Sequence, residues 1–244
     1  MLSLVIFFQL KMPPLIMPSK FLLYGDSITQ RAFAVETRGW VAQLANAYVR
    51  HADIINRGLS GYNSEWCLKV APQILNEYSH LELTIVFIGV NDCYLPINPQ
   101  QHVPLDRYRR NLAEILAIAK TKGRVLVLCP TFVDIDAWER QRISVGKVLD
   151  RSVDFTKQYH DACYEVATEC ACASVKTWTY FVDASQEDMF TDGLHLSSSG
   201  NDLMFKLITD AIENNWPELK PDLMRTFLPL SGTVDPNNLD MLFE

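Results

Sequence analysis

Five short apolar segments between residue 20 and residue 176 have the pattern of buried β-strands. They are rich in Val, Ile, Leu and Phe, show little polar alternation, and most are followed closely by Gly, Pro or Asn. Such runs are typical of parallel strands that are covered on both faces of a sheet. The segments are Phe21–Tyr24, Asp53–Ile55, Leu83–Ile88, Arg124–Leu128 and Ala173–Val175.

Between these segments, apolar residues recur at helical spacing. Ser152 precedes the longest of these stripes and is expected to cap its first turn. Another helical pattern, over Ser64–Tyr78, contains Pro72, which is expected to kink or divide the helix. The other helical stripes, including the one behind Ser152, are Trp40–Tyr48, Tyr108–Ala119, Phe155–Cys170 and Met204–Ile212.

The alternation of strands and helices from residue 20 to about residue 215 predicts one α/β domain. Right-handed crossovers between parallel strands place helices on both faces of the sheet. We therefore expect a three-layer α/β/α sandwich around a mostly parallel five-stranded sheet, with a flavodoxin-like arrangement. Residues 20–216 are expected to form this domain, residues 1–19 an apolar leader, and residues 217–244 a tail packed on the surface or at a partner interface.

Composition and charge exclude several classes of protein. The apolar fraction of 48% and the charged fraction of 21% exclude a disordered chain. The net charge is −7, and residues 123–244 alone hold 20 acidic and 10 basic residues. Because such a surface repels phosphate and anionic lipid, nucleic acid is not expected as a partner. No apolar run approaches the roughly 20 residues that cross a bilayer, so no membrane span is expected.

The cysteines and the N-terminal residues favour a cytoplasmic protein. Only Cys170 and Cys172 lie close together among the six cysteines, and no second Cys or His pair stands at zinc spacing. We therefore expect six reduced thiols and no metal site. The apolar stretch Met1–Leu10 has no basic segment before it and no small-residue cleavage site. Secretion through this stretch is the alternative.

Polar and glycine-containing loops border the predicted strands and helices, and they hold the candidate chemistry. The carboxyl ends of parallel strands meet at one edge of a sheet, where reactive groups gather. A hydroxyl, an imidazole, a carboxylate and oxyanion donors at this edge are the groups that acyl transfer requires. The four loops are Gly25–Thr29, Asn56–Gly61, Gly89–Asp92 and Asp192–Ser197.

Ser27 is the candidate nucleophile, because it lies where a strand gives way to a helix. A serine hydroxyl needs a base, and His195 is the candidate that accepts its proton and returns it to the leaving group. Asp192, three residues before His195, can fix the imidazole tautomer. The candidate oxyanion donors are the backbone N–H groups of Ser27 and Gly61 and the side-chain amide of Asn91.

Each of these motifs also has an ordinary structural explanation. Gly-Asp-Ser is usually a turn, Asn91 can cap a helix, and Gly61 can serve only to permit a positive φ. Asp26 and Asp92 are expected to bond local backbone. Cys93 can line an acyl pocket or be a small buried hydrophobic residue. The functional interpretation is favoured because four such signals fall together at the expected edge. The other histidines sit in loop or helix contexts without an acid or nucleophile motif and are expected to be structural; they are His51, His80, His102 and His160.

These loops resemble the four blocks of the SGNH hydrolases, also called the GDSL esterase/lipase family. The likeness extends from about residue 20 to residue 215 and is strongest to the isoamyl acetate-hydrolysing esterase branch. Ile28 replaces the leucine of the family's name, a change that conserves side-chain volume. The family's Ser, Gly, Asn and His, and the acid of its DxxH element, fall on Ser27, Gly61, Asn91, His195 and Asp192.

The resemblance implies a serine esterase that hydrolyses acetate esters of short alcohols through an acyl-enzyme, without a metal or cofactor. Its partner would be a small ester, and a homodimer stays open, since the chain departs from the branch beyond Pro217. Two alternatives remain. The same site could act on a lysophospholipid, an acyl-thioester or an acetylated sugar. The fold could instead be a catalytically silent module that binds a ligand in the same crevice.

Overall fold

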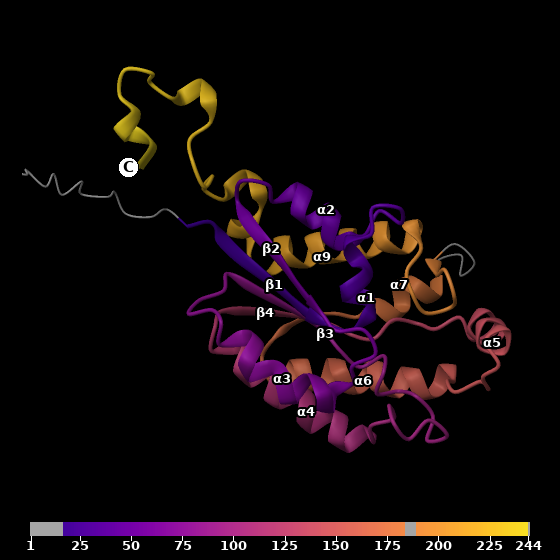
Figure 1. The fold of residues 1–244 in the computed structure, drawn as a ribbon. Helices are drawn as coiled ribbons and strands as arrows, with labels where there is room; N and C mark the ends of the chain where they lie inside the picture. Colours follow the sequence, from indigo (N-terminus) through magenta and orange to yellow (C-terminus); the bar gives the residue numbers. More distant parts are fainter. Residues whose placement is uncertain (1–16, 184–188, 244) are drawn as a thin grey trace, which may run out of the picture.

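The computed structural model describes residues 17–183 and 189–243, and a five-stranded parallel sheet lies at its centre (Figure 1). The strand order is β2-β1-β3-β4-β5, and every pairing is parallel. Gly25, the last residue of β1, lies opposite both Gly58 and Phe87. The loops that follow the first three strands therefore leave the sheet side by side. The strands are β1 (Ser19–Gly25), β2 (Ala52–Gly58), β3 (Leu83–Phe87), β4 (Arg124–Leu128) and β5 (Ala173–Val175).

Helices cover both faces of the sheet, which confirms the predicted three-layer α/β/α sandwich. Side chains of β1 alternate between two apolar clusters, with Phe21 and Leu23 in one and Leu22 and Tyr24 in the other. The first cluster packs against α2 (Trp40–Ala47) and α9 (Ser198–Asn215), and the second packs against α3 (Ser64–Leu75), α4 (Leu105–Lys120) and α6 (Val153–Glu169).

The predicted cap of one helix is confirmed, whereas the predicted division of another helix is not. The Ser152 hydroxyl accepts a hydrogen bond from the Phe155 N–H at 3.2 Å and caps α6, as predicted. Pro72, however, does not divide α3, which runs without interruption from Ser64 to Leu75. Its buried residues Cys67, Ala71 and Leu75 pack in the second apolar cluster on both sides of the proline. This packing holds the helix together where the local sequence opposes it.

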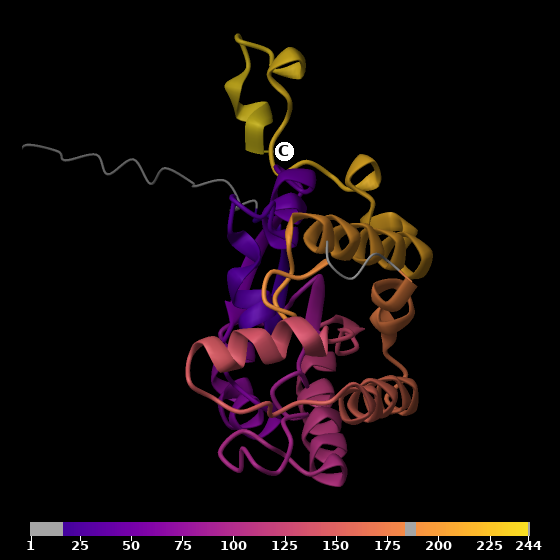
Figure 2. The same ribbon diagram turned by 90° about the vertical axis from the view of Figure 1, so that its right-hand side faces the viewer.

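Two further helices lie near the carboxyl ends of the strands, α5 (Ile135–Ser144) and α7 (Thr177–Asp183). After α9 the chain forms short 3₁₀ turns, and its last part extends away from the sheet at the end opposite α1 (Ser27–Gln30), as Figures 1 and 2 show. In the described ranges no helix is long and apolar enough to cross a membrane. All six cysteines are free thiols. Residues 1–16 of the expected leader lie outside the described residues.

Candidate active site

Ser27 begins α1 directly after β1, at the carboxyl edge of the sheet. The carboxylate of Asp26 accepts a hydrogen bond from the Ile28 N–H at 2.9 Å and caps this short helix, so Asp26 bonds local backbone as expected. Ser27 is only 5% exposed. Its own N–H group has no acceptor within the described part of the chain. The turn therefore presents a hydroxyl and a free amide hydrogen together.

A chain of hydrogen bonds joins Ser27 to residues from the other end of the sequence. His195 Nε2 lies 2.9 Å from Ser27 Oγ, and His195 Nδ1 lies 2.7 Å from Asp192 Oδ2. Because Asp192 accepts the proton on Nδ1, Nε2 is left to accept from the Ser27 hydroxyl. The structure thus brings together the three residues that the sequence named as nucleophile, base and acid.

Hydrogen bonds within the loop and one close backbone approach fix the position of the loop that carries His195. The second oxygen of Asp192 accepts the N–H groups of His195 at 2.8 Å and Leu194 at 3.0 Å. Thr191 N–H donates to the His195 carbonyl at 2.8 Å. Gly193 has φ +89, and a Cβ there would lie 2.4 Å from the carbonyl oxygen of Asp134, just before α5. Only glycine allows this close approach of the His195 loop to the start of α5.

The carboxylates around Ser27 differ in their pKa because their surroundings differ. Burial acts to raise the pKa of Asp192, but the hydrogen bonds from His195 and Leu194 outweigh burial and hold the pKa below its ordinary value. Asp192 is therefore ionised at neutral pH and can stabilise a protonated His195. Burial raises the pKa of Asp26 to about 6, although the Ile28 N–H and the charges of His195 and Arg151 oppose it.

The candidate oxyanion donors lie on the loops after β2 and β3. Gly61 has φ +79, and its N–H, like that of Ser27, has no acceptor among the described residues. The Asn91 side chain is 4% exposed and donates one N–H to the Tyr62 carbonyl at 2.9 Å, which leaves its second N–H for another acceptor. Gln101 donates to the Gly61 carbonyl at 2.7 Å and fixes this loop.

The structure gives Asp92 a distant partner and decides between the two interpretations of Cys93. Both oxygens of Asp92 accept the N–H of Ser64, at 2.9 and 3.0 Å, because α3 begins next to this carboxylate, so its main partner lies outside its own loop. Cys93 is fully buried and donates to the Val90 carbonyl at 3.2 Å. It therefore cannot line an acyl pocket. His160 is also buried and bonds the Pro130 carbonyl, as a structural histidine would.

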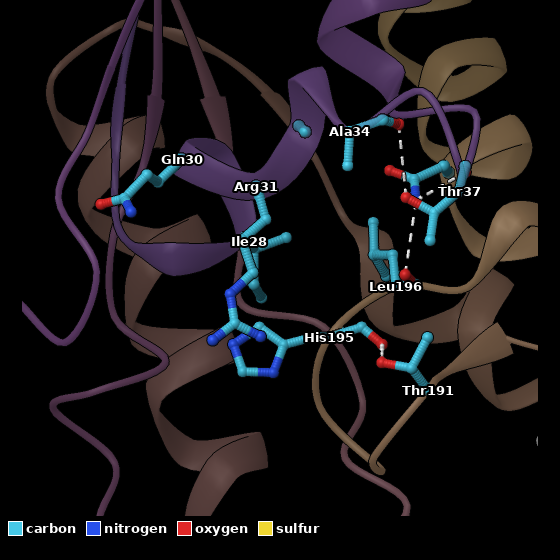
Figure 3. A pocket seen from close by; sticks show the side chains of 10 residues that line it. Ile28, Gln30, Arg31, Ala34, Thr37, Thr191, His195 and Leu196 are labelled. Carbon is cyan, nitrogen blue, oxygen red and sulfur yellow. Dashed lines mark hydrogen bonds between the residues drawn. The ribbon is translucent and has the colours of Figure 1, made fainter.

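Two pockets open beside these residues. The pocket in Figure 3, of about 370 Å³, contains His195 together with Ile28, Ala34 and Leu196, and the Arg31 side chain reaches over it. A second pocket, of about 560 Å³, lies on the Gly61 side. It is lined largely by aromatic, amide and basic side chains, including Tyr62, Trp66, Tyr94, Gln101 and Arg142. Over residues 17–183 and 189–243, no group of three His, Cys, Asp or Glu side chains could hold a metal ion.

Arg151 lies close to this centre, and nothing in the sequence pattern singles it out. It is 1% exposed, and its guanidinium contacts the Val90 carbonyl, one residue before Asn91. A lone arginine in a polar segment normally lies on the surface. Its burial became visible only in the structure.

Fold and site together define a class of α/β ester hydrolases. The chain belongs to the GDSL-like lipase/acylhydrolase family, whose sequence model matches residues 23–203. It is accordingly a carboxylic ester hydrolase of the esterase/acylhydrolase kind.

Individual relatives are similar over most of their length. The isoamyl acetate-hydrolyzing esterase 1 homolog of Homo sapiens is 36% identical over 203 residues, which cover 80% of this chain and 81% of the relative. The isoamyl acetate-hydrolyzing esterase of Saccharomyces cerevisiae is 33% identical over 223 residues, or 84% of this chain and 91% of the relative.

Solved structures share the fold. A lipase/acylhydrolase from Enterococcus faecalis superposes with a TM-score of 0.63 at 23% identity and covers 80% of this chain and 96% of its own. An acetyl xylan esterase variant from Geobacillus stearothermophilus superposes with a TM-score of 0.62 at 20% identity, over 80% and 96% of the two chains. These likenesses confirm the predicted fold class.

Proposed function

We propose that this chain is a serine esterase that hydrolyses short-chain carboxylic esters, with acetate esters as its preferred substrates. The observation that carries the proposal is the hydrogen-bonded chain from Ser27 through His195 to Asp192. The names of the human and yeast relatives, which are isoamyl acetate esterases or their homologs, support the choice of ester.

The first half of the reaction forms an acyl-enzyme. Ser27 Oγ attacks the ester carbonyl carbon while its proton passes to His195 Nε2, and Asp192 stabilises the imidazolium that results. The carbonyl oxygen becomes an oxyanion, which accepts hydrogen bonds from the N–H groups of Ser27 and Gly61 and from Asn91. Loss of one such donor typically lowers kcat by about 10²–10³-fold. The intermediate then expels the alcohol, whose oxygen takes the proton from His195.

The second half releases the acid. A water molecule gives a proton to His195 Nε2 and attacks the acyl carbon, and the same donors hold the new oxyanion. The intermediate collapses, the bond to Ser27 Oγ breaks, and His195 returns the proton to the serine.

The position of His195 supports a proposal for the alcohol side of the substrate. The group that protonates the leaving oxygen must lie next to it. We therefore expect the alcohol to occupy the pocket of about 370 Å³ that His195 shares with the apolar side chains Ile28, Ala34 and Leu196. A pocket of this size and lining suits a short branched or linear alcohol better than a long one.

Replacement of the nucleophile tests the proposal. We expect Ser27→Ala to lower kcat on a chromogenic acetate ester by at least about 10³-fold, because no other group can form the acyl-enzyme. Ser231→Ala, in the exposed tail, is the matched control and should keep wild-type turnover. Mass spectrometry after fluorophosphonate treatment should place the adduct on Ser27. Wild-type turnover by Ser27→Ala would refute the proposal, and so would the lack of an adduct.

A series of acyl chain lengths separates the substrate classes. We expect kcat/KM to fall steeply beyond about two to four acyl carbons, since the preferred acyl group is acetyl. A rise toward long chains would favour a lysophospholipid or thioester substrate. A preference for acetylated sugars over acetates of simple alcohols would move the assignment to a carbohydrate esterase.

A further inference from the structure

Arg151 is a buried cation without a carboxylate partner. It is 1% exposed, and no acidic side chain of the described residues lies within 4.0 Å of its guanidinium. The neighbouring Asp150 is bonded instead to Arg142 and, at 3.0 Å, to the Trp138 indole N–H. Arg151 Nε and Nη2 have no hydrogen-bond partner in the described part of the chain.

Aromatic rings and one peptide carbonyl hold this guanidinium. Its carbon lies 3.7 Å from the ring centroid of Tyr94 and 5.1 Å from that of Trp138. Nη1 donates to the Val90 carbonyl and lies 3.4 Å from the Cys93 sulfur. Aromatic faces stabilise a cation without neutralising it. Arg151 therefore keeps its positive charge in a region of low dielectric, with no carboxylate of the described residues in direct contact.

Stability alone does not account for such a residue. A buried charge is costly to desolvate, and apolar side chains of similar volume are often as good or better for folding. The Val90 carbonyl belongs to the peptide that joins Val90 to Asn91, whose side-chain amide is a candidate oxyanion donor. The charge of Arg151 also acts to lower the pKa of Asp26, the residue before Ser27. Its field thus reaches the centre of the site.

We propose that Arg151 is a positioning residue of the esterase site, which anchors the peptide before Asn91 and supplies a positive charge behind the oxyanion. The proposal rests on the proposed function, because it needs a negatively charged tetrahedral intermediate. A carboxylate partner would cancel the charge, whereas Tyr94 and Trp138 keep it. Arg151 acts more strongly on the intermediate than on the neutral ester, so it raises kcat more than it lowers KM.

Two substitutions separate the charge from the shape of the side chain. Arg151→Met keeps the length and the aromatic contacts but removes the charge and the donor. Arg151→Lys keeps the charge and can still donate to the Val90 carbonyl. Thr177→Val is the matched control, because the buried Thr177 hydroxyl also donates to peptide carbonyls, those of Cys129 at 2.8 Å and Pro130 at 3.2 Å, neither of which belongs to the Asn91 loop.

The readouts are kcat and KM on an acetate ester, and the affinity for a trifluoromethyl ketone, which forms an oxyanionic adduct with a catalytic serine. We expect Arg151→Met to lower kcat by about 10²-fold, to change KM by less than about twofold, and to weaken inhibitor binding by about the same factor as kcat. Arg151→Lys should stay within about tenfold of wild type on both readouts. Thr177→Val should keep the wild-type kcat and inhibitor affinity.

Several results would overturn the proposal. These are a wild-type kcat in Arg151→Met, an equal loss in the Met and Lys variants, or a rise in KM with kcat unchanged. If Arg151→Met does not fold, Arg151→Lys decides, since a 10²-fold loss of inhibitor affinity there contradicts a role of the charge. An inactive Ser27→Ala beside a fully active Arg151→Met refutes this proposal alone. An active Ser27→Ala refutes the proposed function.

Discussion

Three carboxyl groups near Ser27 differ in pKa because their hydrogen bonds and surroundings differ. Asp192 receives the imidazole of His195 and two backbone N–H groups, so its pKa lies below the ordinary value despite burial. Asp26 and Asp92 are 1% and 0% exposed, and burial raises their pKa to about 6 and about 7. The site thus keeps one ionised acid next to the base and two acids that titrate close to neutral pH.

The raised pKa of Asp92 predicts a dependence of stability on pH. Below about pH 4 the carboxyl holds its proton in both the folded and the unfolded chain. Between about pH 4 and pH 7 the unfolded chain has lost the proton and the folded chain keeps it, so the free energy of unfolding falls as pH rises. The loss levels off above about pH 7 and amounts to at most about 4 kcal/mol.

Asp92→Asn should remove the contribution of Asp92 to this slope, because asparagine carries no titratable proton and its oxygen can still accept the Ser64 N–H. Urea unfolding of both proteins from pH 4 to pH 8 measures the effect. Between pH 4 and pH 6 the slope should fall by about half, since Asp26 still contributes there, and between pH 6 and pH 7 it should nearly disappear. Asp53→Asn, at an exposed position on β2, controls for the loss of one negative charge. An unchanged slope in Asp92→Asn would show that this carboxyl is already ionised in the folded chain.

At the scale of helices and strands, the sequence predicted those elements that a local hydrophobic pattern marks. The five strands were predictable because long apolar side chains occupy both faces of a covered sheet. α5 was not predicted, because Trp138 is its one buried residue and it has no apolar stripe. The fully buried Cys93 and the bonds of Asp92 to Ser64 also depend on segments distant in sequence.

In the candidate site, too, only residues that a local motif marks could be predicted from the sequence. Ser27, Asp192 and His195 could be named because each stands in a short motif at the expected edge of the sheet, and their catalytic roles stay predictions. Arg151 could not be named, since its burial depends on Tyr94 and Trp138 from separate segments. Tertiary packing, not local sequence preference, determines whether such a residue is buried.

Pro72 in α3 is a place where packing overrides local preference, and its replacement should increase stability. Proline lacks the N–H that would donate to the Leu68 carbonyl one turn earlier. Pro72→Ala supplies this donor at an exposed position and should raise the free energy of unfolding by about 1–2 kcal/mol, after the loss of proline's entropic benefit. Urea unfolding measures this. The neighbouring exposed Gln73→Ala should change stability by less than about 0.5 kcal/mol. A destabilised Pro72→Ala would mean that the helix is already adapted to the proline.

At the scale of the whole molecule, the candidate site lies at one end of the parallel sheet and the C-terminal tail contacts the other end. All four candidate loops meet at the carboxyl end, where Ser27 and His195 lie. The tail contacts the opposite end, just before β2 begins. There Arg50 donates to the carbonyls of Leu228 at 2.8 Å and Pro229 at 2.7 Å, and the Phe227 N–H donates back to the Arg50 carbonyl.

This separation predicts that the tail can be loosened without an effect on turnover. Arg50→Ala removes both side-chain hydrogen bonds to the tail and should raise the rate at which subtilisin cleaves near residues 225–230, because exposed segments without anchors are cut first. Since these bonds are exposed, the free energy of unfolding should change by less than about 1 kcal/mol.

The values of kcat and KM on an acetate ester should stay at those of wild type, since the sheet separates Arg50 from Ser27 and, among the described residues, no backbone hydrogen bond joins the tail to the site loops. Arg225→Ala, a neighbouring exposed arginine, controls for the loss of positive charge and should leave the cleavage rate unchanged. A fall in kcat with Arg50→Ala would mean that the two ends of the sheet are energetically coupled, and the tail would then be part of the enzyme's working structure.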